Sequence, residues 1–453
     1  MTASSLPPAQ PVVPFGRAMR DAHFPFSPDY TPLNHGSYGS YPASVRGVQA
    51  ALRSEVEEAP DRFIVLEWPT RLREARAATA RVLSCETDDV VFVPNTTTGI
   101  DTVLKNIKFQ PGDVVLIYEV VYDAVRGGLA WLEETFGVRV EVVPLCIPLS
   151  DDEIVDAVVG AARRVNESGS GNDDERVRLA IVDTVASLPG VRLPFERLVP
   201  ALKAEGALVL VDGAHGIGHV DIDLSTLDPD FFVTNLHKWL FVPRAAAALY
   251  VPRRHQGLMR TSLPTSHRFR KRGDDANKNA FIELFDFTAT MDTTNYLTVK
   301  AALAFRDEVC GGEEAIHTYC RALARESGEV AASILGTEVM DVAAGGSSSC
   351  MRECNFANVR LPVVISDSDS GAAGTGTGTT AVHPRDAKEV IMWFKRTGTL
   401  ESGTYFQICH YRGALWWRLS ATVYVEVDDF RKGAKVLLGL CERVGKGEWI
   451  EAA

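Results

Sequence analysis

Short apolar runs recur between residues 90 and 251 and are separated by amphipathic stretches. The runs are almost continuous, which is typical of strands buried on both faces of a mostly parallel sheet. The stretches between them have the spacing of helices that connect such strands. The pattern therefore predicts an α/β fold with a mostly parallel seven-stranded sheet, its strands at residues 90–93, 114–118, 138–143, 179–182, 207–211, 231–233 and 246–251.

The pattern differs on either side of this region. Residues 45–83 have helical spacing, and residues 1–30 are rich in proline, which predicts an irregular arm. After about residue 295, two helical patterns bracket two shorter strand patterns, which favours a smaller α+β domain. The helices are expected near 296–335 and 428–444, and the strands near 355–363 and 405–422. We expect an N-terminal arm at 1–44, a large domain at 45–295 and a small C-terminal domain at 296–453. The N-terminal segment could also pack on the small domain.

Two segments rich in glycine, serine and aspartate interrupt this order, at residues 166–176 and 366–380. Such compositions bury too little apolar surface to fix one conformation. We expect both to be mobile surface loops.

Composition narrows the classes of partner. The formal net charge of −12 argues against a nucleic-acid partner, and no apolar run approaches the length of a membrane span. The N-terminus lacks the basic start and apolar core of a secretory signal. The eight cysteines form no CxxC pair and have no zinc-like spacing with histidine, which indicates reduced thiols and no metal site. These features predict a cytoplasmic protein.

Lys238 lies between apolar runs in the stretch NLHKWLFV. Loss of solvation lowers the pKa of a lysine, and the neutral amine can then attack a carbonyl cofactor. The alternative is a lysine that extends its charged end to the surface.

Two further motifs follow predicted strands. Asp212 comes directly after the strand at 207–211, where ligands bind in parallel sheets and where a carboxylate can contact a pyridine nitrogen. The motif NTTTG at 95–99 leads into a helix, whose N-terminal N–H groups and hydroxyls can bind phosphate. Each motif has a plain alternative, because aspartate and threonine are also common helix caps.

Together and in this order, the motifs resemble those of the fold-type I pyridoxal-phosphate enzymes, in the class V aminotransferase branch. The resemblance runs from about residue 30 to the last predicted helix. It rests on LNHGSYGSYP, NTTTG, VDGAHGIGHV, NLHKWLF, FTATMDTTNY and WWRLSATVY.

The resemblance implies pyridoxal 5'-phosphate as the cofactor and assigns residues to it. Lys238 would bind it covalently, and Asp212 would contact its pyridine nitrogen. The other contacts implied are with the phosphate (Thr96, Thr97, His237), the ring face (Tyr122) and the ring oxygen (Ser187, His215).

The resemblance also implies an amino-acid substrate and a shared site. Arg418 would bind the substrate α-carboxylate, for which a guanidinium is well suited. Asn34 and His35 belong to the arm that closes over the site in similar proteins. Thr290 would reach the phosphate of a neighbouring subunit, which implies a homodimer, although Ala289 stands where the family has glycine.

The motifs LNHGSYG and HKWLF are most similar to the isopenicillin-N-epimerase-like group, which includes fungal C–S lyases of ergothioneine biosynthesis. This similarity implies β-elimination from hercynylcysteine sulfoxide to ergothioneine (through its sulfenic acid), pyruvate and ammonia. The alternatives are an epimerase, a cysteine desulfurase and a catalytically inactive regulator. A desulfurase is the less favoured, because the cysteines at 350 and 354 precede the predicted strand and Cys409 comes too soon before Arg418.

Two expectations concern this substrate. Cys146 follows a predicted strand and could react with a sulfenic acid, or it could simply pack at the strand end. A trimethylammonium group could be held by aromatic rings, for which the candidates are Tyr38, Tyr41, Phe63, Trp416 and Trp417.

Overall fold

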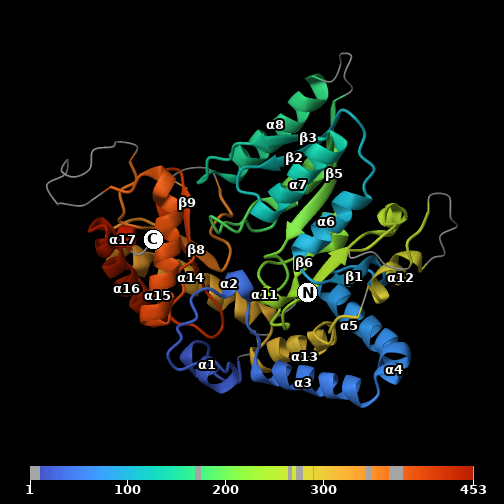
Figure 1. Cartoon of the computed structure of the whole chain (residues 1–453), viewed down its shortest axis with the longest axis horizontal. Coiled ribbons are helices and arrows are strands. Elements are labelled where there is room, and N and C mark those ends of the chain that lie inside the picture. The colour runs from blue at the N-terminus through green and yellow to red at the C-terminus, as the bar shows by residue number, and fades with distance from the viewer. Residues whose placement is uncertain are drawn as a thin grey trace, which may run out of the picture.

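A seven-stranded sheet forms the centre of the computed structural model (Figure 1). The structure describes residues 11–168, 175–263, 268–271, 279–288, 290–342, 348–366 and 381–451. The strand order is β1-β7-β6-β5-β4-β2-β3, and β7 runs in the opposite direction to the other six strands. The predicted mostly parallel sheet is confirmed, with its strands at β1 (Val90–Val93), β2 (Asp113–Tyr118), β3 (Arg139–Val143), β4 (Arg176–Asp183), β5 (Leu208–Gly213), β6 (Phe231–Asn235) and β7 (Ala247–Tyr250).

Both faces of this sheet are covered, because successive side chains of a strand point to opposite faces. Val90 and Phe92 belong to one apolar core, whereas Val91 and Val93 belong to another. The edge strand β3 is less buried than the others.

Helices connect the strands and cover the sheet. Two stretches expected to be helical are interrupted: Pro60 begins a new short helix, and Gly311 and Gly312, both with positive φ, precede α14. The helices are α1 (Arg17–His23), α2 (His35–Tyr38), α3 (Ala43–Glu58), α4 (Pro60–Arg62), α5 (Trp68–Val82), α6 (Thr96–Asn106), α7 (Asp123–Phe136), α8 (Asp151–Ser168), α9 (Phe195–Ala204), α10 (Leu224–Leu227), α11 (Leu236–Trp239), α12 (Ala280–Asp286), α13 (Val299–Ala304), α14 (Glu313–Leu335), α15 (Ala387–Ser402), α16 (Val427–Gly445) and α17 (Glu448–Glu451).

A second, antiparallel sheet lies beside the first, with the order β8-β10-β9 (Figure 1). Its strands are β8 (Phe356–Arg360), β9 (Ile408–Tyr411) and β10 (Ala414–Ser420). Helices α14, α15 and α16 share a separate apolar core with it. Among the described residues, no helix is long and apolar enough to cross a membrane.

The N-terminal segment packs on this second unit. It is not wholly irregular as expected, because α1 forms at Arg17–His23, and Arg20 of this helix makes a partly buried ion pair with Asp429 at 2.8 Å. The two expected mobile loops are at 166–176 and 366–380, and most of each lies outside the described residues, at 169–174 and 367–380. Ala289 also lies outside the described residues.

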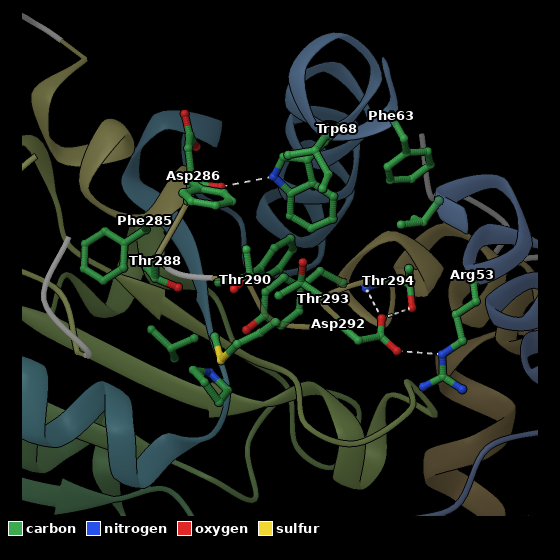
Figure 2. Close-up of a pocket in the computed structure, with 18 of the residues that line it drawn as sticks. Arg53, Phe63, Trp68, Phe285, Asp286, Thr288, Thr290, Asp292, Thr293 and Thr294 are labelled. Atoms are coloured by element: carbon green, nitrogen blue, oxygen red, sulfur yellow. Dashed lines mark hydrogen bonds and ion pairs between the residues drawn. The ribbon is translucent and has the colours of Figure 1, made fainter. Parts of the chain in front are cut away.

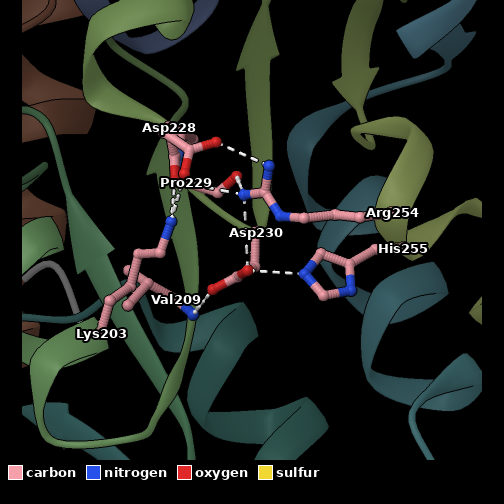
Figure 3. Close-up of polar contacts among 7 residues, drawn as sticks. All are labelled: Lys203, Val209, Asp228, Pro229, Asp230, Arg254 and His255. Carbon is pink, nitrogen blue, oxygen red and sulfur yellow. Dashed lines mark hydrogen bonds and ion pairs between the residues drawn. The ribbon is translucent and has the colours of Figure 1, made fainter.

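A cluster of charges lies where β5 and β6 begin (Figure 3). Asp230 Oδ2 accepts a hydrogen bond from the backbone N–H of Val209 at 2.8 Å, and its Oδ1 lies 2.6 Å from His255 Nε2. Asp228 accepts from Lys203 and Arg254, each at 2.6 Å. The cluster fixes the amino ends of two neighbouring strands, because each carboxylate has at least two partners.

Candidate active site

Lys238 lies in the short helix α11, which directly follows β6 at the carboxyl end of the sheet. Its Nζ lies 3.2 Å from Nε2 of His215. Desolvation, with a smaller contribution from the positive charge of Arg418, lowers the pKa of Lys238 to about 8. A substantial fraction of this amine is therefore neutral near physiological pH and can act as a nucleophile or base.

The N-terminal segment closes directly over the lysine turn. Gly39 has φ of 66°, and a Cβ at this position would lie 1.8 Å from the carbonyl oxygen of His237. Only glycine allows this approach, since it has no Cβ and adopts positive φ without strain. Arg244 Nη1 also donates to the Gly39 carbonyl, at 2.8 Å.

Asp212 lies at the end of β5, as predicted, and a second carboxylate lies beside it. Asp183 ends β4 in register with Asp212, and both side chains line the same cavity. Desolvation raises the pKa of Asp212 to about 6, so this carboxylate is largely ionised at pH 7. Burial and the nearby Asp212 hold the pKa of Asp183 well above its ordinary value, and Tyr118 donates a hydrogen bond to Asp183 at 2.8 Å.

Asp183 is not among the site residues predicted from the sequence, although the sequence contains a signal for it. Strand β4 ends in Val-Asp at 182–183, and β5 has Val-Asp at 211–212, directly before its last residue. Since neighbouring parallel strands end at the same edge, a repeated strand-end aspartate predicts two adjacent carboxylates.

The N-terminus of α6 forms another wall of the cavity. Asn95 caps this helix through a 2.8 Å hydrogen bond from the Thr98 N–H, and Asn235 accepts from the Thr96 N–H at 3.0 Å. The Thr96 hydroxyl is buried and has no hydrogen-bond partner within the described part of the chain. Thr97 is exposed and also lines the cavity.

The cavity has a volume of about 210 Å³. The predicted residues that line it are Thr96, Thr97, Tyr122, Ser187, Asp212, His215, His237 and Lys238. His237 is neutral at physiological pH, because burial lowers its pKa to about 4, and its Nδ1 lies 2.8 Å from the Ala246 carbonyl. Of the aromatic residues proposed to hold a trimethylammonium group, only Tyr38 lines this cavity.

Arg418 lies on β10 and is 1% exposed. Its guanidinium donates to Ser187 O at 2.8 Å, to Ser37 Oγ at 2.9 Å and to Asn34 Oδ1 at 3.2 Å. Burial lowers its pKa to about 10, which leaves it charged at pH 7. It has no carboxylate partner among the described residues, and a buried cation with only neutral partners suits an anionic ligand.

Two predicted residues, His35 and Cys146, lie outside the cavity around Lys238. His35 is buried beneath the site, where its Nδ1 lies 2.6 Å from the hydroxyl of Tyr424 and its ring packs on Trp239. Cys146 is exposed beyond the edge strand β3 and is not one of the described residues that line the cavity around Lys238. Cys146 instead lies beside the side chain of Arg412, and its reaction with a sulfenic acid stays a prediction.

Thr290 lines a different cavity, of about 400 Å³ (Figure 2). Phe63, Trp68 and Phe285 give this cavity apolar walls, and Arg53 donates to Asp292 at 2.6 Å on one side. Thr290 does not line the cavity that contains Lys238 of the same chain.

The side chains present fit the expected pyridoxal phosphate. An unpartnered buried hydroxyl at a helix N-terminus suits the phosphate, and Asp212 suits the pyridine nitrogen. Lys238 lies in the same cavity, with an amine that is partly neutral.

Comparison with known proteins agrees with this geometry. Residues 65–364 match the family model "Aminotransferase class-V". The chain is 37% identical over 447 residues to the L-cysteine desulfhydrase-like protein lolT1 of Epichloe uncinata, covering 95% of this chain and 97% of the relative. It is 27% identical over 432 residues to the hercynylcysteine sulfoxide lyase of Schizosaccharomyces pombe, covering 94% and 98%.

Among solved structures, the complex of the cystine C-S lyase C-DES with cysteine persulfide is similar in fold. Its TM-score is 0.67 at 17% identity, with 90% of this chain and 97% of that chain covered. Both chains therefore share one fold.

Proposed function

Because the chain belongs to the class V aminotransferase family, whose enzymes use pyridoxal 5'-phosphate, we propose that it is a carbon–sulfur lyase acting on an L-cysteine derivative. The observation that carries the proposal is one cavity that contains Lys238 and Asp212, while two residues that line it, Ser37 and Ser187, contact Arg418. The names of the two relatives above support sulfur chemistry.

Each residue has a defined task in this proposal. Bound pyridoxal phosphate supplies an electron-accepting ring that stabilises negative charge at the substrate α-carbon. Asp212, ionised at pH 7, keeps the ring nitrogen protonated. Arg418 binds the substrate carboxylate, and Asn34 and Ser37 hold the guanidinium in place.

Lys238 carries out the proton transfer. Its neutral amine takes the α-proton, and the Cβ–S bond then breaks with the electron pair leaving on sulfur. Addition of water to the remaining three-carbon fragment gives pyruvate and ammonia. A sulfoxide substrate would release a sulfenic acid, whereas cysteine would release sulfide.

Two substrates are candidates. Hercynylcysteine sulfoxide is the substrate in the name of one relative, which matches almost the whole chain. L-Cysteine is the second candidate, because the relative with 37% identity is named as desulfhydrase-like. Tyr38, 60% exposed at the cavity, lies where the distal part of a larger substrate could contact an aromatic ring.

The test measures pyruvate released by the purified enzyme from hercynylcysteine sulfoxide, from L-cysteine and from other cysteine S-conjugates. Pyruvate with a sulfur-bearing imidazole product would support the first substrate, and pyruvate with sulfide would support the second. Alanine in place of pyruvate would indicate a desulfurase, and inversion at the α-carbon an epimerase. A cofactor-loaded protein that turns over none of them would favour the regulator.

The desulfurase alternative lacks a reactive thiol near Arg418. Burial raises the pKa of Cys409 to about 12, and Cys350 and Cys354 are buried with pKa values raised to about 12 and about 11. These thiols are therefore protonated at pH 7, whereas a sulfur acceptor has to attack as thiolate.

We also propose that the protein is a homodimer in which Thr290 completes the phosphate site of the partner. Thr290 is exposed and lines a cavity separate from that of Lys238. Sedimentation should show a dimer, and Thr290→Ala should release cofactor more readily than the parent. A monomer with full cofactor affinity would contradict this arrangement.

A further inference from the structure

Trp239 follows Lys238 and makes one polar side-chain contact within the site. Its indole Nε1–H donates a hydrogen bond to Nδ1 of His215 at 3.1 Å. An indole nitrogen can only donate, so Nδ1 of His215 has to be the acceptor. A neutral imidazole that accepts at Nδ1 carries its proton on Nε2.

His215 is neutral in this environment. It is 1% exposed, and burial holds its pKa well below the ordinary value. Its Nε2–H therefore faces Lys238 Nζ, 3.2 Å away. A protonated lysine has only donors and cannot accept this hydrogen bond, whereas the neutral amine can.

The indole is held so that this contact persists. Trp239 is 2% exposed, and its ring stacks on His219 with centroids 4.1 Å apart. Its carbonyl accepts from the buried Arg306 at 2.6 Å.

His219 is itself fixed in the opposite tautomer. The backbone N–H of Asn355 donates to its Nε2 at 2.8 Å, so its proton lies on Nδ1, which is 2.9 Å from the carbonyl of His215. The backbone and the ring of His215 are thus each held by a separate hydrogen bond.

We propose that Trp239 is a positioning residue that fixes His215 as the Nε2–H tautomer, so that His215 donates toward Lys238 and favours its neutral amine. The proposal adds to the proposed function, because the neutral amine is the base in that reaction. The contact itself involves no substrate and can be tested without turnover.

The direct test is the tautomer of His215 in holoenzyme labelled with ¹⁵N-histidine, read from long-range ¹H–¹⁵N spectra. The signal is assigned by its loss in His215→Gln. We expect a single Nε2–H tautomer in the parent and a mixture of both tautomers in Trp239→Phe. An Nδ1–H tautomer in the parent, or an unchanged tautomer in Trp239→Phe, would overturn the proposal.

The second readout is the pH profile of kcat for the substrate that releases pyruvate, because the Lys238 amine acts as base only once the substrate is bound. Without the indole N–H, the acid limb should move to higher pH, and kcat at pH 7 should fall about fivefold to tenfold. Trp393→Phe is the matched control, because that buried indole packs against Arg443 in the core of the second sheet. An equal shift in the control would show a general effect of losing a buried indole and would count against Trp239.

A double variant separates positioning from packing. The amide of glutamine has no tautomers, so Trp239→Phe should change kcat less than about twofold in a His215→Gln background. A loss as large as in the parent background would mean that Trp239 acts through packing. Absence of pyruvate from every substrate would contradict the proposed function, while the tautomer measurement would still decide on Trp239.

Discussion

Charged groups lie at both ends of strands β5 and β6, but among the described residues they form ion pairs at the amino ends and not at the carboxyl ends. At the amino ends, Asp228 and Asp230 are paired with Lys203, Arg254 and His255 (Figure 3). At the carboxyl ends, Asp212 and Lys238 share a cavity without forming an ion pair, and Arg418 has only neutral partners. The ion pairs at the amino ends stabilise the fold, whereas the groups at the carboxyl ends remain available to bind a ligand.

The pKa shifts follow the same division. Burial alone raises the pKa of Asp230, but the hydrogen bonds from His255 and Val209 outweigh it and lower the pKa overall. At the other end, desolvation dominates: the pKa of Asp212 rises to about 6 and that of Lys238 falls to about 8. The shifts at the carboxyl ends are thus toward the neutral form, as is common at functional sites, whereas the paired Asp230 is shifted toward the charged form.

The largest expected effect is at Lys238. Lys238→Ala should lower kcat by about a thousandfold or more, because no other amine lies in position to take the α-proton among the described residues of the cavity. Pyruvate release and cofactor absorbance measure this. Lys203→Ala removes a lysine from the opposite end and should retain activity. Comparable losses of kcat in both variants would refute the view that catalytic groups lie only at the carboxyl ends of these strands.

The next effect concerns substrate binding. Arg418→Lys should raise KM about 10- to 100-fold and change kcat less, because an ammonium cannot bind a carboxylate in the bidentate way. Steady-state kinetics measure both constants. Arg254→Lys, at the opposite end, should leave KM unchanged. If Arg418→Lys alters only thermal stability, the arginine serves structure and not the substrate.

At the amino ends of β5 and β6, substitutions should affect stability more than catalysis. Asp230→Asn should lower the free energy of unfolding by about 1–3 kcal/mol and leave kcat/KM within twofold. Because the pKa of Asp230 is lowered in the folded state, its stabilising effect is present above the unfolded value of about 3.9 and is lost as pH falls through the folded value. Urea unfolding at pH 7 and near pH 3 should therefore show a difference between parent and variant that shrinks in acid.

The smallest effect is expected at Cys146. Since it is exposed and does not line the cavity among the described residues, Cys146→Ala should change pyruvate release less than about twofold. Product analysis would also reveal a trapped sulfenic acid. A slow second phase in the variant would restore the role that the sequence suggested for this thiol.

The sequence predicted the sheet well and the details of the site less well. Continuous apolar runs located all seven strands, because burial on both faces needs that pattern. The antiparallel direction of β7 was not predicted, since a short apolar run is the same in either direction. The bond between Trp239 and His215 was also missed, because the residues are 24 positions apart and only the fold brings their rings together.

The hydrogen bond from Arg418 to Asn34 joins residues 384 positions apart, and the ion pair of Arg20 with Asp429 spans 409 positions. A growing chain therefore emerges with Asn34 long before Arg418 is synthesised. Closing a loop of this length costs conformational entropy, which the contacts at its ends have to offset. A chain that stops before β10 consequently lacks Arg418, the guanidinium that our proposal assigns to the substrate carboxylate.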